Sequence, residues 1–345
     1  KLYSYYYATE ELAMKITRLA VQHVRVHTLK TLDLEPGTTL ISGPNGSGKT
    51  SLIEAIHIAL RGTSFRGSDE AVCQHEQKSY TIDLATDEQH YRVQYDRRHE
   101  TKRKRFIVDG TTYGRLPYGK KYPIVLFEPD TLRIITGSPQ RRRDFLDTLI
   151  QQYDAHYSHE LSRYHRALQQ RNKLLKDPAL SDAALFSWNL ILSQHGASII
   201  TKRQRVLRYL NAKSSAMYQS IAGVADSIAL HYSEERSVTV QQLLAEYEQK
   251  TAYDTVVGAT SVGPHRHDIT VLFRGNLAAK TASRGEIRTI VLALKFLEAA
   301  YIQQQTGQAP LILLDDVFGE LDQQRQQRLL SEFVDNQIVM TSAVE

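Results

Sequence analysis

The pattern of hydrophobic and polar residues indicates strands in two stretches of the first third of the chain. Residues 15–42 alternate with a period of two, which is typical of edge and hairpin strands, and residues 79–109 again have strand character. Residues 39–42 lead into a glycine-rich turn. The short apolar run PIVLF at 123–127 predicts a central strand of a sheet.

Hydrophobic residues recur every three or four positions in other parts of the chain, which predicts helices. This spacing covers residues 51–61, 283–305 and 323–335, with the apolar face of the second helix running through Ile287, Ile290, Leu294 and Leu297. Residues 141–222 have the same spacing with one proline, Pro178, and predict two or three long helices. Strand character returns at 250–280, and buried strands are expected at 310–314 and 337–341. The pattern predicts an α/β domain interrupted by a helical insertion.

Composition sets limits on this fold. A length of 345 residues suggests about two domains. The single cysteine, Cys73, excludes an intramolecular disulfide and a cysteine-rich zinc site. The single cysteine also fits a reducing compartment, so we expect a cytoplasmic protein. No apolar run approaches the ~18 residues of a membrane span, and we expect no membrane partner. Residues 1–13 (KLYSYYYATEELA) are expected to be a leader before a natural start at Met14.

Charge is unevenly distributed along the chain. The formal net charge is +5, and residues 14–125 hold 18 Lys and Arg against 12 Asp and Glu. Residues 309–345 hold two Arg against seven Asp and Glu. A basic lobe suits nucleic acid, although charge alone agrees equally well with a solvated surface.

The most specific signal is a phosphate-binding loop. Residues 43–50 (GPNGSGKT) match G-x-x-x-x-G-K-[ST] in full, with an apolar strand before and an amphipathic helix after. Such a loop wraps phosphates with its backbone N–H groups, while lysine neutralises phosphate oxygens and the threonine hydroxyl is a ligand for Mg²⁺. We therefore expect ATP and Mg²⁺ as cofactors. The nucleotide-binding residues are Asn45, Gly46, Gly48, Lys49, Thr50 and Ser51.

Two carboxylates follow the apolar run LILL at 311–314. A P-loop ATPase needs one carboxylate at the metal and a second near the attacking water. Asp315 suits the first position, with Thr50 as the other metal ligand, and Asp316 suits the second. We predict Lys49, Asp315 and Asp316 as the catalytic residues.

A serine-glycine turn, ASRGE at 282–286, precedes the helix at 283–305. Here the chain resembles the ABC-type ATPases, whose signature turn is S-x-G followed by Gln or Glu. In that class two copies of the protein sandwich two ATP molecules. The resemblance implies that Ser283 and Gly285 act in trans on nucleotide bound to the other copy, with Asp322 in the cross-dimer loop. By itself Asp322 is equally well explained as a helix N-cap.

Several segments narrow the resemblance to the RecF family. They occur in family order: Thr63-Ser-Phe-Arg66 after the P-loop helix, the segment 129–147 (PDTLRIITGSPQRRRDFLD), GPHRHD at 263–268 and LDDVFGELD at 314–322. The segment 129–147 is the most specific of these, and the resemblance spans almost the whole chain from Met14.

The resemblance implies an ABC-type ATPase head with a mixed sheet and an inserted, mainly helical arm. We expect head segments at 14–135 and 253–345 and the arm at 136–252. The implied function is recombinational DNA repair and replication-gap processing. An ATP-dependent homodimer would bind duplex or junction DNA and act with RecO and RecR to load recombinase.

The chain departs from the ABC pattern at several positions. Asp316 stands where the common class has Glu, so we expect weak hydrolysis. The switch histidine is absent, and Thr341 and Ser342 stand near its place. No Q-loop glutamine is evident, because Glu128 and Pro129 occupy that region. The family's F-R-N reads Val-Arg-Val at 24–26, so only Arg25 carries over.

A run of cations on one predicted hairpin is our candidate DNA contact. It comprises Arg97, Arg98, Lys102, Arg103, Lys104 and Arg105. Such a run contacts phosphates without reading bases, but a solvated hairpin tip has the same composition. Arg66, Arg115, Lys120 and Lys121 are weaker candidates. Residues 141–143, all arginine, fit DNA contact or pairing with acidic residues equally well, and His265 and Arg266 fit a structural role.

Two other functions remain open at this point. One is the nucleotide-binding subunit of another ABC-type complex, such as a membrane transporter, which the basic hairpin disfavours. The other is a scaffold that binds ATP without hydrolysing it. Replacing Asp316 by Asn separates the scaffold from the enzyme.

Overall fold

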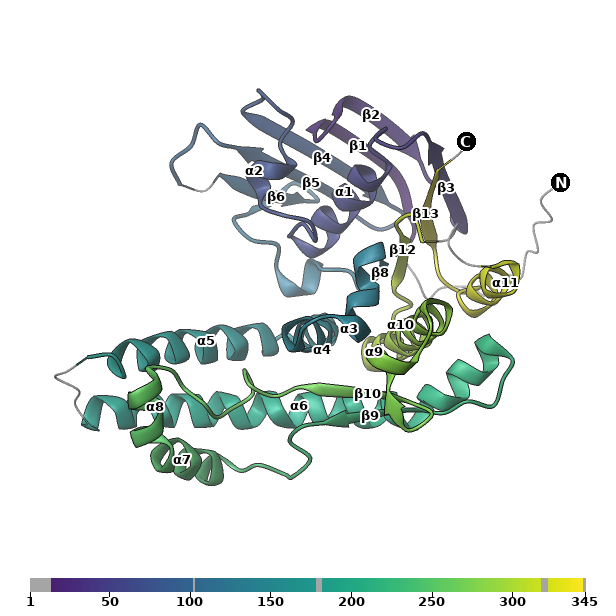
Figure 1. The fold of residues 1–345 in the computed structure, drawn as a ribbon. Helices are drawn as coiled ribbons and strands as arrows, with labels where there is room; N and C mark the ends of the chain where they lie inside the picture. Colours follow the sequence, from purple (N-terminus) through teal and green to yellow (C-terminus); the bar gives the residue numbers. More distant parts are fainter. Residues whose placement is uncertain (1–13, 102, 178–181, 318–321, 344–345) are drawn as a thin grey trace. The chain divides into compact units, whose positions relative to one another are not determined.

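The computed structural model describes residues 14–101, 103–177, 182–317 and 322–343, so the expected leader, residues 1–13, lies outside the described part. The chain forms two compact units (Figure 1). The first unit comprises the described residues up to Thr131 and from Glu298 onward, and the second unit is Leu132–Leu297. None of the described helices is long and apolar enough to cross a membrane.

The first unit contains an antiparallel sheet with strand order β2-β1-β4-β5-β6-β7. Its strands are β1 (Ile16–Val24), β2 (His27–Asp33), β4 (Ser79–Thr86), β5 (His90–Asp96), β6 (Lys104–Val108) and β7 (Thr111–Tyr113). Inward and outward residues alternate along β5, whose Tyr91, Val93 and Tyr95 are buried. The strands predicted at 15–42 and 79–109 are confirmed, and they pair antiparallel as β1–β2 and as β4–β5–β6.

A second sheet of the first unit is parallel, with strand order β3-β13-β12-β8. Its strands are β3 (Thr38–Gly43), β8 (Ile124–Phe127), β12 (Leu311–Leu314) and β13 (Ile338–Ala343). The prediction of a central strand at 123–127 is wrong, because β8 is at the edge of this sheet and pairs with β12 alone among the described strands. A strand whose side chains are almost all buried has the same apolar composition at the edge as at the centre when other elements cover it.

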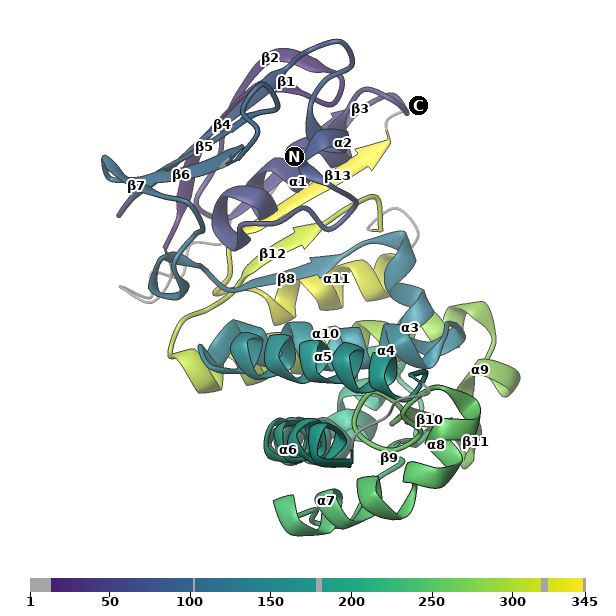
Figure 2. The same ribbon diagram turned by 90° about the vertical axis from the view of Figure 1, so that its left-hand side faces the viewer.

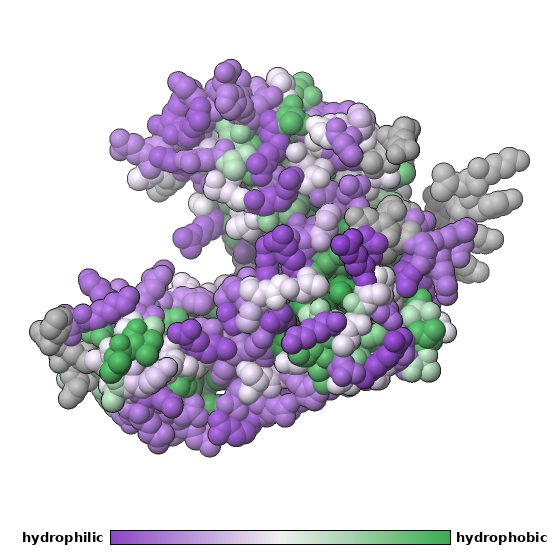
Figure 3. Space-filling model, in the orientation of Figure 1, coloured by the Kyte–Doolittle hydropathy of each residue, from purple (hydrophilic) through white to green (hydrophobic). Residues whose placement is uncertain are grey.

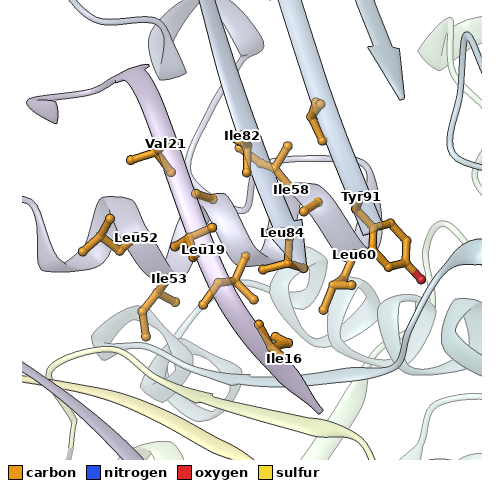
Figure 4. Packing of buried hydrophobic residues seen from close by; sticks show 14 of the residues in the cluster. Ile16, Leu19, Val21, Leu52, Ile53, Ile58, Leu60, Ile82, Leu84 and Tyr91 are labelled. Carbon is orange, nitrogen blue, oxygen red and sulfur yellow. The ribbon is translucent and has the colours of Figure 1, made fainter. Parts of the chain in front are cut away.

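Helices cover both faces of the parallel sheet. Figure 2 shows α1 (Lys49–Arg61) and α11 (Gln323–Glu332) on opposite sides of it. Helix α1 also packs on β1, β4 and β5, so it lies between the two sheets. The core there contains Leu19, Ile53 and Ile82, each no more than 1% exposed (Figure 4). The short elements of this unit are α2 (Asp69–Val72) and a 3₁₀ turn at Tyr118–Lys120.

A loop of residues 62–67 is docked on α1. Gly62 ends the helix in the left-handed conformation, φ 88°, and its N–H bonds to the carbonyl of Ile58. The imidazole of His57 donates from Nδ1 to the carbonyl of Thr63 over 2.7 Å and contacts the ring of Phe65 edge-on. Burial lowers the pKa of His57 to about 4, although the hydrogen bond that its ring donates to the carbonyl of Thr63 acts to raise it.

The second unit consists mainly of helices. They are α3 (Arg133–Thr136), α4 (Pro139–Tyr153), α5 (Tyr157–Leu174), α6 (Asp182–Ala222), α7 (Val240–Gln249), α8 (Thr251–Val257), α9 (Ala278–Thr281) and α10 (Arg284–Thr306), whose last turns belong to the first unit. A 3₁₀ turn at Pro129–Leu132 leads into α3. The long helices predicted at 141–222 are confirmed as α4, α5 and α6, the last of which has 41 residues.

A small sheet of the second unit changes the expected division of the chain. Strands β9 (Ile228–Tyr232), β10 (Ile269–Phe273) and β11 (Asn276–Leu277) pair in the order β11-β10-β9. Because β10 pairs with β9, the segment after residue 252 is joined to the helical unit, whose boundary lies at Leu297 rather than at 252. The strand expected at the start of 250–280 is helical instead, as α8.

Three arginines connect the long helices of this unit to residues 254–268. Arg171 of α5 is fully buried and donates to Asp254 (2.7 Å), Asn189 (2.6 Å) and Thr260 (2.7 Å). Arg203 of α6 forms a double hydrogen bond with Asp147 and also donates to the carbonyl of Pro264.

The third arginine, Arg142 of α4, donates two hydrogen bonds of 2.7 and 2.9 Å to the carboxylate of Asp268. Of the two roles left open for this arginine run, the structure shows ion pairing for Arg142. The neighbouring Arg143 donates to the carbonyl of His267. His265 contributes to the same packing, because its ring lies 2.7 Å from the hydroxyl of Tyr164.

Hydrophobic side chains are exposed on α8. Tyr253, Val256 and Val257 are 59%, 87% and 53% exposed. Figure 3 shows hydrophobic colour in this part of the second unit, amid a mainly hydrophilic surface.

Replacing Arg171 by Met should destabilise the second unit by about 3–5 kcal/mol, because Asp254 would stay buried without its partner. Urea unfolding followed by circular dichroism measures the loss. The matched control is Arg236→Met, whose side chain is 73% exposed beside Glu234, and it should leave the unfolding midpoint unchanged. Equal midpoints for the two variants would contradict the stabilising role of the buried pair.

Acid should weaken the docking of residues 62–67 on α1. The pKa of His57 is lowered from 6.5 in the unfolded chain to about 4 in the fold, so between these values the unfolded chain binds more protons. The free energy of unfolding should therefore fall as the pH drops from 6.5 towards 4, by at most about 3 kcal/mol from this group. Well above pH 6.5 His57 is neutral in both states, so its titration does not change the free energy of unfolding there.

The variant His57→Asn keeps an N–H donor but does not titrate, and its stability should depend less on pH over this interval. Denaturant titrations at several pH values provide the comparison. His75→Asn, at a position whose side chain is 95% exposed, serves as control and should follow the unaltered protein. A His57→Asn curve parallel to that of the unaltered protein would refute the assignment.

Candidate active site

Residues 43–50 form the turn from β3 into α1, as the P-loop pattern predicts. Gly48 precedes the helix with φ 90°, in the left-handed region. A Cβ at Gly48 would lie 2.4 Å from Nε2 of His27 and 2.4 Å from Cγ2 of Val26. Both the conformation and the close approach of the β1–β2 turn therefore require glycine here. The start of α1 faces this loop with the positive end of its dipole, which suits phosphate.

The ammonium group of Lys49 lies over the loop. Lys49 is the first residue of α1 and is 9% exposed. Its Nζ donates to the carbonyls of Gly43 (2.7 Å) and Pro44 (3.0 Å). These two bonds hold the charge beside the loop, where it can neutralise an anion bound to the backbone.

Two threonines converge on one carboxylate oxygen at the end of β12. The hydroxyl of Thr50, on α1, donates to Oδ1 of Asp315 over 2.8 Å. The hydroxyl of Thr341, on β13, donates to the same oxygen over 3.0 Å and accepts from the backbone N–H of Asp316 over 2.8 Å. The two predicted motifs therefore meet through a direct hydrogen bond, and Thr341 fixes both acidic residues.

Asp316 is one of the residues that line a pocket at the P-loop. Its φ of 55° is unusual for a residue other than glycine, and the bond from its N–H to Thr341 stabilises this turn. The pocket has a volume of about 360 Å³. It is lined by Arg25, Val26, Asn45, Gly46, Gly48, Lys49, Thr50, Ser51, Arg66 and Asp316.

The structure therefore brings together every residue assigned to the P-loop and the two carboxylates predicted to be catalytic, since Asp315 bonds to Thr50 and Asp316 lines the pocket. It also adds residues that sequence reasoning missed at this site. Arg25 carried over from the family pattern without a role, and Arg66 was only a weak DNA candidate. Thr341 stood at the place of the absent switch histidine, where a hydroxyl gave no sequence signal.

The residues expected to act in trans lie at helix starts elsewhere. Ser283 and Glu286 form a reciprocal cap at the start of α10 in the second unit, with bonds of 2.7 and 3.3 Å. A Cβ at Gly285 would meet nothing within 4 Å, so the backbone there is open. Asp322 caps α11 by accepting from the N–H of Arg325 over 2.9 Å. These contacts give each residue a local role and leave its role in trans a prediction.

The cationic hairpin β5–β6 is partly neutralised by neighbouring carboxylates. Arg98 forms an ion pair with Asp96, and Arg103 forms one with Glu70 over 3.1 Å. Lys104 is largely buried and bonds to Asp69 and to the carbonyl of Gly62.

Two other candidates on this hairpin, Arg97 and Arg105, are exposed, and no described carboxylate pairs with either of them. Lys102 lies outside the described residues. Arg97 and Arg105 are therefore the better candidates for contact with phosphates.

Comparison with known proteins agrees with this geometry. A family model described as an AAA domain matches residues 18–252. The DNA replication and repair protein RecF of Acaryochloris marina is 31% identical, over 92% of this chain and 89% of its own length. The RecF protein of Moorella thermoacetica is 33% identical over 92% of this chain and 86% of its own length.

A solved structure is similar over the whole fold. The recombination mediator protein RecF with ATP, of the RecFOR pathway, matches with a TM-score of 0.87 and 26% identity. The match covers 99% of this chain and 95% of that chain. The chain therefore belongs to the RecF family of DNA replication and repair proteins, which are ATPases of the P-loop class.

Proposed function

We propose that this chain binds ATP with Mg²⁺ at the P-loop pocket and hydrolyses it weakly. The bond between Thr50 and Asp315 is the observation that carries the proposal, because it joins the two halves of a nucleotide site from distant parts of the sequence. The RecF–ATP structure, at 26% identity, supports ATP as the ligand.

The donor set fits Mg²⁺. Thr50 and Asp315 offer a hydroxyl and a carboxylate oxygen, with no sulfur or imidazole, and hard oxygen donors are what Mg²⁺ prefers. Among the described residues there is no group of three or more His, Cys, Asp or Glu that would enclose a metal. This agrees with an ion that takes its remaining ligands from phosphates and water. When bound, Mg²⁺ neutralises charge on the β- and γ-phosphate oxygens.

The residues of the chain divide the remaining work. The loop 43–50 and Lys49 bind and orient the polyphosphate. Thr341 holds Asp315 and Asp316 in place. Asp316 is a lining residue of the pocket, and we assign to its carboxylate the role of orienting the attacking water and accepting its proton. The shorter side chain of Asp, compared with Glu, is the reason for expecting slow turnover.

Replacing Asp316 by Asn should lower the turnover of ATP by about 10²-fold or more while ATP still binds, because the amide accepts no proton. A phosphate-release assay measures turnover and a fluorescent ATP analogue measures affinity. Lys49→Ala is the control, and it should lose binding as well. Unchanged turnover in Asp316→Asn would favour the scaffold that binds ATP without hydrolysing it.

We further propose that ATP drives homodimerisation and that the dimer binds duplex or junction DNA. By resemblance, Ser283, Gly285 and Asp322 of one copy contact the nucleotide of the other. The exposed Arg97 and Arg105 contribute phosphate contacts without reading bases. RecO and RecR are the proposed partners in loading recombinase, and the cytoplasm is the proposed location, as for a protein that acts on chromosomal DNA.

Affinity for a short duplex should rise when ATP and Mg²⁺ are added, and it should track dimer formation in a sizing run. Affinity should also fall steeply with salt, because bound cations release counterions from DNA. The double replacement of Arg97 and Arg105 by Gln should weaken binding severalfold and reduce the salt slope by about two. Lys30→Gln, an exposed cation on β2, is the matched control with no expected effect.

Equal DNA affinity with and without ATP would contradict the ATP-closed clamp. An ATP-dependent dimer with weak DNA binding would instead assign the DNA contact to a partner protein. Co-purification with a membrane subunit would favour the transporter alternative.

A further inference from the structure

A fully buried carboxylate lies on α1 one turn after the P-loop. Glu54 is 0% exposed, and its neighbours on the helix, Ile53, Ala55 and Ile56, belong to the hydrophobic core. Its oxygens accept from Nε and Nη2 of Arg25 at 2.9 and 2.8 Å, and from the hydroxyl of Ser64 at 2.5 Å. A buried ion pair seldom adds net stability over a hydrophobic replacement, so stability alone does not explain a carboxylate here.

One partner of Glu54 belongs to the turn between β1 and β2. Arg25 has φ 53°, and its N–H donates to the carbonyl of Val72 over 2.8 Å. The two hydrogen bonds to Glu54 use two of the five guanidinium N–H donors and fix the plane of the guanidinium group. The other guanidinium donors of Arg25 do not bond to Glu54, and Arg25 is one of the residues that line the P-loop pocket.

The other partner fixes the loop after α1. The Ser64 hydroxyl that donates to Glu54 also accepts from the backbone N–H groups of Arg66 (2.9 Å) and Gly67 (3.1 Å). Arg66 is exposed and lines the same pocket as Arg25. One carboxylate therefore bonds directly to the side chain of Arg25 and, through Ser64, is linked to the backbone of the loop that carries Arg66.

We propose that Glu54 is a positioning residue for nucleotide, which holds Arg25 and Arg66 at the P-loop pocket so that their guanidinium groups meet the polyphosphate. This inference rests on the proposed ATP site and adds to it a preference for ATP over ADP. Two cations beside the pocket favour the ligand with more phosphate charge, so ATP gains more from them than ADP does.

The direct test is Glu54→Gln, which keeps the size of the side chain and removes its charge. The dissociation constants of fluorescent (mant) ATP and ADP are measured, together with turnover of unlabelled ATP. We expect affinity for ATP to fall about tenfold and affinity for ADP about threefold or less, with kcat within about threefold of the unaltered protein. A defect confined to folding would lower the apparent affinity for both nucleotides by the same factor.

Matched variants separate the two branches of the cluster. Ser64→Ala removes the bond to the loop of Arg66 and keeps the pair with Arg25, so it should lose less ATP affinity than Glu54→Gln. Glu70→Gln removes an exposed carboxylate that pairs with Arg103 in the same unit, and it should bind both nucleotides normally. If Glu54→Gln does not fold, Ser64→Ala carries the test, because it keeps both arginines and should lower affinity for ATP more than affinity for ADP.

The outcomes distinguish this inference from the proposed function. Equal losses for ATP and ADP, or no loss, in a folded variant would overturn the inference while ATP binding that depends on Lys49 still stands. If the unaltered protein binds no ATP, or binds it equally well after Lys49→Ala, the proposed function fails first.

Discussion

The hydrogen bonds that converge on Oδ1 of Asp315 hold the site of the first unit together. One comes from Thr50 at the start of α1 and the other from Thr341 on β13. The loop between β3 and α1 and the carboxyl end of β12 are thus fixed to each other by side chains as well as by the sheet. Loss of this oxygen would leave two buried or half-buried hydroxyls without their acceptor, which is costly in a low-dielectric interior.

The chemistry of the site could be predicted from sequence because each part of it is local. A P-loop needs glycines, lysine and threonine at fixed spacing, and a carboxylate at the end of a buried strand needs no long-range information. The hairpins and the long helices were predictable for the same reason, since their periods of two and 3.6 are written along the chain. The order of the motifs along the chain indicated the family.

The features that could not be predicted depend on contacts between distant segments. The place of β8 at the sheet edge depends on which strand pairs with β12, and the unit boundary at Leu297 depends on pairing between β9 and β10. In the sequence, Glu54 is one polar residue on an apolar helix, and its role depends on the hydrogen bonds from Arg25 and Ser64, which only the fold shows. Helix α8 lies in a short stretch of β-branched residues, where tertiary packing overrides propensity.

The order of the parallel sheet has a consequence for synthesis of the protein. Strand β3, which leads into the P-loop, pairs with β13, and the register joins Thr38 to Ile338. A ribosome releases β3 long before β13 is made, so during elongation the strand has no partner within its own sheet. The nucleotide site can therefore assemble only after β13 has been made, when the helical unit between its halves has already had time to fold.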